Sequence, residues 1–121
     1  MKCLKMARRR KKNKNGKHQN GVDSLEQRLL DSGHYESVST NEVYELGECD
    51  IKTKALNRRE YWEYKCNHTG KGYTKARRQL QRWSWYMYSK DPSKDWYGIY
   101  IAGNMQTPIV MVKNGKFRNY D

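Results

Sequence analysis

Long apolar runs are missing from this 121-residue chain. No stretch approaches the roughly 18 apolar residues of a membrane-spanning helix, and the N-terminus lacks the apolar segment of a secretory signal. These absences favour a soluble, intracellular protein that does not bind membranes.

Cysteines are also few. The three thiols, Cys3, Cys49 and Cys66, are odd in number and lack close pairs, which argues against a disulfide framework and predicts reduced cysteines. A structural zinc site needs two close Cys/His pairs, and only Cys66 and His68 form one. The sequence therefore gives little support to zinc.

Acidic residues are absent before Asp23, whereas the same stretch is rich in lysine and arginine. The whole chain has 25 basic and 13 acidic residues, a formal charge of +12 that attracts polyanions such as nucleic acids. Because a basic tail binds phosphate without any chemistry, the charge alone does not predict an enzyme. We interpret residues 1–22 as a flexible basic arm, with a localisation signal as the alternative. Its expected phosphate contacts are Arg8, Arg9, Arg10, Lys11 and Lys12.

Aromatic side chains, in contrast, are plentiful. Ten Tyr and four Trp provide core material that a disordered chain lacks. The chain length fits a single domain, which we place at residues 23–121. One active site per chain is therefore expected.

The segments after the arm show first a helical and then an extended pattern. Ser24 and Gln27 form a capping box, which predicts a helix from Ser24 to Asp31. Residues rich in β-branched and aromatic side chains then predict three strands and two turns. The strands are expected at 38–44, 49–56 and 60–66, and the turns at Gly47 and 57–59.

The second half of the chain repeats this alternation. A helix is predicted from Lys75 to Lys90. Its buried stripe is expected to contain Ala76, Leu80, Trp83 and Met87. Two strands follow at 96–102 and 109–112, and Asn114-Gly115 predicts a tight hairpin turn. The order of elements predicts an α/β fold in which a mixed β-sheet of about five strands is flanked by helices.

Glu63 and Lys65 fall on one face of the predicted strand 60–66, because side chains alternate along a strand. Asp50 lies in the preceding strand, so pairing of the two strands brings both carboxylates together. Hydrolysis of a phosphodiester at neutral pH needs a divalent ion, and hard cations such as Mg²⁺ bind carboxylate oxygens. Asp50 and Glu63 are thus candidate metal ligands, and Lys65 is placed to offset developing negative charge.

These residues resemble a known superfamily signature. Gly47-Glu48-Cys49-Asp50-Ile51 precedes Glu63-Tyr64-Lys65, with twelve residues between Asp50 and Glu63, and the pattern is similar to that of PD-(D/E)XK nucleases. The resemblance extends over roughly residues 22–112 and is closest to the minimal archaeal and phage Holliday junction resolvases. It implies a restriction-endonuclease-like fold, Mg²⁺ as cofactor with Mn²⁺ as a substitute, and a homodimer. It further implies branched DNA as substrate, in the cytoplasm of a prokaryotic or virus-infected host.

The resemblance also implies roles for individual residues. The implied catalytic residues are Glu26, Asp50, Glu63 and Lys65. Glu26 matches the glutamate that an N-terminal helix donates in this superfamily. The implied metal ligands are Asp50, Glu63, Glu26 and the backbone carbonyl of Tyr64. Glu48 shares a strand face with Asp50 and is a rival to Glu26 for completing the ligand set.

The helix 75–90 carries further candidates. Lys75, Arg78 and Arg82 lie off its buried stripe and are expected to contact DNA phosphates, although a solvated basic face explains them equally well. The aromatic side chains around Trp85 are interpreted as packing or dimer surface, with base stacking as the alternative.

A second function is compatible with the same residues. The protein is then a non-catalytic basic nucleic-acid-binding protein, in which Asp50, Glu63 and Lys65 only form salt bridges. Cleavage of DNA that depends on Mg²⁺ separates this hypothesis from the nuclease.

Overall fold

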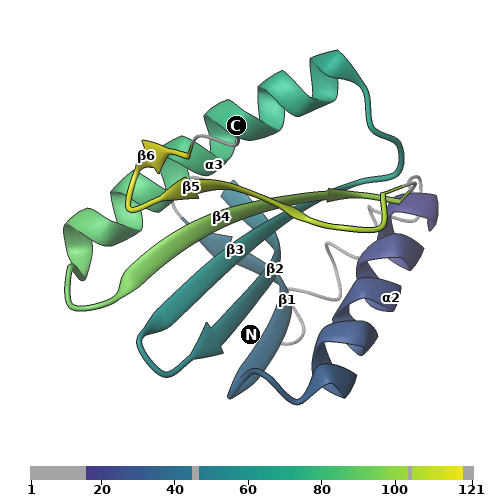
Figure 1. Ribbon diagram of the computed structural model, residues 1–121. Helices are drawn as coiled ribbons and strands as arrows, with labels where there is room; N and C mark the ends of the chain where they lie inside the picture. Colours follow the sequence, from purple (N-terminus) through teal and green to yellow (C-terminus); the bar gives the residue numbers. More distant parts are fainter. Residues whose placement is uncertain (1–15, 45–46, 104, 119–121) are drawn as a thin grey trace.

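The computed structural model describes residues 16–44, 47–103 and 105–118, and all of their side chains except those of 42–44 and 47–49. The five expected phosphate contacts of the arm, the Glu48 side chain and the structure of residues 1–15 lie outside this description. The described residues form an α/β fold with a six-stranded mixed sheet flanked by two helices (Figure 1). The predicted fold class is therefore confirmed, with one strand more than expected.

The elements follow the chain in a simple order. They are α2 (Gly16–Ser32), β1 (Ser37–Tyr44), β2 (Gly47–Ala55), β3 (Arg58–Lys65), α3 (Gly70–Lys90), β4 (Asp95–Ala102), β5 (Ile109–Lys113) and β6 (Lys116–Phe117). The strands lie side by side in the same order, β1 to β6. β3 and β4 are parallel because α3 crosses over between them, and the other pairs are antiparallel. No helix in the described part of the chain is long and apolar enough to cross a membrane.

The two helices cover opposite faces of the sheet, as the alternation along β3 requires (Figure 1). Tyr61 packs with Leu80 and Trp83 of α3 in one core cluster. Trp62, the next residue, packs with Val22 and Leu25 of α2 in the other. The predicted division of β3 into two faces is confirmed, so the faces of Glu63 and Tyr64 are fixed by the core on either side.

The start of α2 differs from the prediction. The helix begins at Gly16, so Ser24 lies in its interior and the predicted capping box is wrong. Gln27 donates instead to Oδ1 of Asp31, 2.8 Å away. Val22 is fully buried, which shows that the last residues of the supposed arm belong to the core. The apolar pattern starts late because the first turn of the helix contains only glycine and polar residues.

Gly21 in this helix marks a close approach to the sheet. A Cβ atom at Gly21 would lie 2.3 Å from the ring of Tyr64, and one at Gly103 would lie 2.7 Å from its hydroxyl oxygen. Both glycines therefore make room for the Tyr64 side chain. This packing joins α2 to the end of β3, where the candidate site lies.

α3 also begins earlier than predicted. It starts at Gly70 rather than Lys75, and the Oγ1 atom of Thr69 accepts a hydrogen bond from the Gly72 N–H at 3.0 Å. This cap satisfies one of the free N–H groups of the first turn. Gly70 and Gly72 have a low helix propensity, so the sequence did not predict that this first turn is helical. The predicted stripe is confirmed, with Met87 at its partly buried end.

The β2–β3 turn is shorter than predicted, whereas the β5–β6 turn agrees with the prediction. β2 and β3 are joined by Leu56 and Asn57 alone, so Arg58 and Arg59 already belong to β3. Asn114 and Gly115 form the predicted hairpin turn, with φ angles of 52° and 83°. Two successive positive φ angles are typical of a type I′ turn. This turn adds the short edge strand β6, which accounts for the sixth strand.

Candidate active site

Asp50 and Glu63 face each other where the pairing of β2 and β3 ends. Ile51 pairs with Trp62, and one further step in this antiparallel register places Asp50 opposite Glu63. At that point the Tyr64 N–H donates to Oδ2 of Asp50, 2.9 Å away. A side-chain carboxylate thus replaces the backbone acceptor that a continued ladder would provide, which fixes Asp50 at the edge of the paired region.

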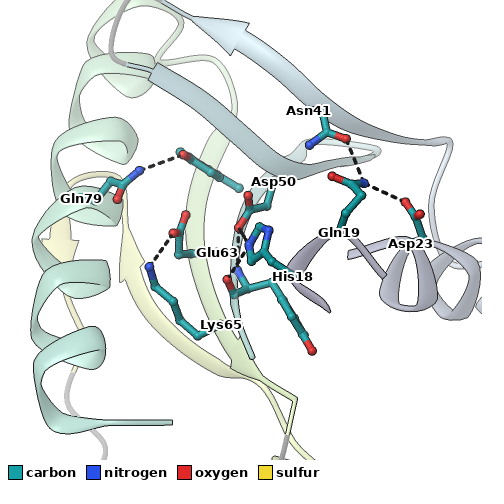
Figure 2. Close-up of polar contacts among 10 residues, drawn as sticks. His18, Gln19, Asp23, Asn41, Asp50, Glu63, Lys65 and Gln79 are labelled. Carbon is teal, nitrogen blue, oxygen red and sulfur yellow. Dashed lines mark hydrogen bonds and ion pairs between the residues drawn. The ribbon is translucent and has the colours of Figure 1, made fainter. Parts of the chain in front are cut away.

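The three residues predicted from the sequence come together here (Figure 2). Asp50 and Glu63 are each 7% exposed, so both carboxylates are largely removed from water. Nζ of Lys65 lies 3.4 Å from Oε2 of Glu63, on the same side of β3. Two buried carboxylates and one lysine therefore form a compact polar group at the end of β3.

This proximity changes the acidity of Glu63. Burial, and secondly the negative charge of Asp50, raise the pKa of Glu63 from 4.5 to about 7, while Lys65 acts in the opposite direction. The ionised pair of carboxylates is thus costly in the absence of a nearby cation. Such a pair has a physical reason to bind positive charge.

His18 is a site residue that the sequence analysis missed. Its Nε2 lies 3.1 Å from the backbone oxygen of Tyr64 and 3.6 Å from Oδ2 of Asp50 (Figure 2). The hydrogen bond to Asp50 raises the pKa of the His18 imidazole, and burial partly opposes this rise. The residue was assigned to the arm, although its spacing of four and seven residues from Val22 and Leu25 places it on the same helix face. That spacing was the available signal.

Glu26 occupies a different part of α2. It is eight residues after His18, which corresponds to about 12 Å along the helix axis. Glu26 is itself partly exposed. The residue of α2 that faces Asp50 is therefore His18.

Aromatic residues form the wall behind Glu63. Tyr100 pairs with Glu63 in the β3–β4 register, and burial raises the pKa of the Tyr100 hydroxyl. Nδ1 of His68 lies 3.0 Å from that hydroxyl, and Tyr73 of α3 stacks edge-on against both rings. His68 is itself exposed, and its ring contacts the two tyrosines beside Glu63.

The basic residues of α3 take up different positions around this site. Lys75, Arg78 and Arg82 are all exposed. Gln79 donates to the hydroxyl of Tyr61 at 3.4 Å, on the face that carries Glu63 (Figure 2). Lys75 and Arg82 lie four residues before and three residues after Gln79, so both share its side of the helix, whereas Arg78 lies on the side opposite the buried stripe.

In the observed arrangement, the donor atoms of the site provide only part of what a divalent cation needs. Within the described part of the chain, no three Asp, Glu, His or Cys side chains are placed to hold a metal ion by themselves. The Asp50 carboxylate is directed to His18, and that of Glu63 to Lys65. An ion here needs the carbonyl oxygen of Tyr64 as a further donor and a rotation of Glu63 away from Lys65. The chemistry of the donors, two carboxylates, one carbonyl and one imidazole, suits Mg²⁺ or Mn²⁺.

Comparisons with known proteins give no assignment. No protein-family model matches the chain, and no curated protein is significantly similar to it in sequence. We therefore infer the function from the geometry of the site.

Proposed function

We propose that the protein is a metal-dependent endonuclease that hydrolyses phosphodiester bonds in DNA and prefers branched substrates. The observation that carries the proposal is the position of Asp50 opposite Glu63, with Lys65 beside them, at the end of two paired strands. This arrangement supports the resemblance to PD-(D/E)XK nucleases that the sequence suggested.

Each residue of the site has a distinct role in this proposal. Asp50, Glu63 and the carbonyl oxygen of Tyr64 bind Mg²⁺ or Mn²⁺, and His18 takes the position that the resemblance assigned to Glu26. When bound, the ion stabilises negative charge on the phosphate and makes water a stronger nucleophile. The raised pKa of Glu63 supports this role, because a nearby cation relieves the repulsion between the two carboxylates.

Lys65 has a different role from the carboxylates. If Glu63 held the ion, the ammonium group of Lys65 would lose the partner that lies 3.4 Å away and would be free to face the scissile phosphate. A fixed positive charge at that position stabilises the extra negative charge of the transition state. Lys65 therefore contributes to the rate of cleavage rather than to metal affinity.

Branched DNA is proposed because residues 16–44, 47–103 and 105–118 contain no second folded unit that could read bases. A domain of this size with an excess of basic residues recognises phosphates and the shape of DNA more readily than its sequence. A homodimer is proposed as well, since two active sites are needed to cut two strands of a junction symmetrically.

A panel of labelled substrates tests the proposal. The wild-type protein is expected to cleave a four-way junction in Mg²⁺ more efficiently than a fork, a duplex or a single strand, and to cleave nothing in EDTA. Glu63→Gln is expected to abolish cleavage while DNA binding persists. Glu36→Gln removes an exposed carboxylate outside the site and should cleave like the wild type. Full activity of Glu63→Gln in Mg²⁺ contradicts the assignment.

One observation favours a second candidate. Each carboxylate already has a cationic partner within the protein, His18 for Asp50 and Lys65 for Glu63. Under this alternative the protein is a non-catalytic nucleic-acid-binding protein, and the two pairs only stabilise the fold. Substitution of Glu63 then changes the stability of the protein. The DNA stays uncut with or without metal, both by the wild type and by the variant.

A further inference from the structure

Trp85 is exposed on the side of α3 that faces away from the sheet. Its side chain is 55% exposed, whereas the three other tryptophans of the chain are buried. Arg78, Arg82 and Trp85 are spaced by four and three residues, so they share one face of the helix. This face is opposite the buried stripe and separate from the candidate active site.

The indole of Trp85 is held in place by the β5–β6 turn. A Cβ atom at Gly115 would lie only 2.7 Å from Cε3 of Trp85, so the ring rests directly on the backbone of the turn. The turn is fixed to α3 because Nε2 of Gln81 donates to the Gly115 oxygen, and the Gly115 N–H donates to Oγ of Ser84, each at 2.9 Å. One edge of the ring is thus anchored and the rest faces solvent, which reduces the entropy lost when a ligand binds.

A second aromatic ring flanks the same turn. Phe117 of β6 is 43% exposed and follows Gly115 by two residues. The guanidinium of Arg77 lies over this ring, 3.7 Å from its centroid. The turn is therefore bordered by two exposed rings, one on α3 and one on β6, with arginines beside them.

The charge of α3 is of one sign. The helix contains no Asp or Glu and has six basic residues. They are Lys71, Lys75, Arg77, Arg78, Arg82 and Lys90. A polyanion with exposed aromatic groups is the partner that complements such a face.

We infer that the outer face of α3 is a binding surface for single-stranded nucleic acid, in which an unpaired base stacks on Trp85 and phosphates contact Arg78 and Arg82. Bases within a duplex are already stacked on one another, so an anchored indole selects unpaired ones. Stacking of this kind tolerates any base sequence. The surface is distinct from the carboxylate site, and its function does not depend on cleavage.

The fluorescence of Trp85 provides a direct test. The full-length protein is titrated in EDTA with an oligothymidine of roughly 12 nucleotides and, separately, with a duplex. EDTA excludes metal-dependent cleavage, so the outcome is independent of the proposed nuclease. The single strand is expected to quench the emission and to shield Trp85 from acrylamide, and the duplex to do neither. An emission that the single strand leaves unchanged overturns the inference.

Two variants and a control complete the test. Trp85→Ala is expected to weaken binding of the single strand by about 5- to 100-fold and to leave duplex affinity unchanged. Trp85→Phe preserves a ring against Gly115 and should bind the single strand nearly as well as the wild type, without the fluorescence change. Leu56→Ala removes another exposed hydrophobic side chain, in the β2–β3 turn, and should bind normally.

Other outcomes contradict the inference. An equal loss of single-strand and duplex affinity in Trp85→Ala means that the ring only supports the helix. A shift from dimer to monomer in gel filtration, with single-strand affinity unchanged, means that a second copy of the chain covers Trp85.

Discussion

Nε2 of His18 lies 3.6 Å from Oδ2 of Asp50 and 3.1 Å from the backbone oxygen of Tyr64. Helix α2 thereby extends one side chain to the point where β2 and β3 separate. The imidazole meets two of the oxygen atoms that we propose as metal donors. Substitution of His18 is therefore the change that most readily distinguishes the two interpretations, a metal site and a set of salt bridges.

Substitution of His18 is expected to weaken metal binding. His18→Ala should lower the affinity of the protein for Mn²⁺ by about 10-fold. The effect on Mg²⁺ should be smaller, because imidazole is a better ligand for transition metals than for hard cations. Isothermal titration calorimetry of the metal-free protein measures both. His34→Ala, an exposed histidine beyond the end of α2, is the control, and equal affinities in all three proteins rule out a ligand role.

The stability of the metal-free protein should fall as the pH rises. The folded-state pKa of Glu63, about 7, exceeds its ordinary value of 4.5, so the folded state binds more protons than the unfolded state between these values. The raised pKa of His18 has the same sign, and its contribution is lost as the pH rises above 6.5. Both stabilising contributions are complete at low pH and absent at high pH.

Glu63→Gln removes the larger part of this dependence. In EDTA at pH 8 the variant should have a free energy of unfolding higher than that of the wild type by on the order of 1–3 kcal/mol. At pH 4.5 the difference should be much smaller. Urea unfolding at the two pH values measures it, with the exposed Asp23→Asn as control. A wild-type stability that rises between pH 5 and pH 8 would contradict the assigned acidity.

Gly21 connects the helix to the site. Gly21→Ala places a methyl group 2.3 Å from the Tyr64 ring, which must move, so we expect a loss of about 1–2 kcal/mol in stability together with weaker metal binding. Gly16→Ala is the matched control, because nothing lies within 4 Å of a Cβ at that position. Thermal unfolding and calorimetry report the two effects. Equal stability of the two variants argues against the close packing of α2 on Tyr64.

The basic N-terminal residues should act through charge alone. Removal of residues 1–14 takes away eight lysines and arginines, and should weaken binding to all DNA substrates alike and flatten its salt dependence. Removal of residues 1–20 additionally deletes His18 and should reduce metal affinity. Filter binding at several salt concentrations tests the first effect, and identical salt slopes for the full-length and shortened proteins speak against it.

The proximity of Asp50, Glu63 and Lys65 could be predicted from the sequence because its signals are local. Alternation along β3 places Glu63 and Lys65 on one face, and β2 is adjacent to β3 through a two-residue turn, so Asp50 follows from register. The paired strands therefore needed no long-range information. The same holds for the hairpin at Asn114-Gly115, where the turn residues determine the backbone conformation.

The contribution of α2 could not be predicted in the same way. His18 reaches Tyr64 across 46 residues of chain, and its helix turn contains glycine and polar residues that suggest a loop. The resemblance implied Glu26 instead, because the superfamily's N-terminal helix donates a glutamate and Glu26 is the glutamate of the predicted helix. The position of a helix along a sheet depends on tertiary packing, here on Gly21 against Tyr64, which local patterns do not encode.

Asp50 and Lys65 are expected to differ in function although both belong to the same site. Asp50→Asn removes a metal donor, so its remaining cleavage should increase when Mn²⁺ replaces Mg²⁺ or when the metal concentration is raised. Lys65→Ala should not respond in this way, because the lysine acts on the charge of the transition state. Single-turnover cleavage of a junction at several metal concentrations distinguishes the two. A similar response of both variants contradicts the division of roles.

Calorimetric titration of the full-length protein with Mg²⁺ and Mn²⁺, alone and with junction DNA, tests the metal site itself. We expect binding by the wild type, little or none by Glu63→Gln, and an affinity in Lys65→Ala that equals or exceeds that of the wild type, since the competing ammonium is gone. Absence of metal binding by the wild type, with and without DNA, would contradict the nuclease and leave Asp50, Glu63 and Lys65 as partners in salt bridges.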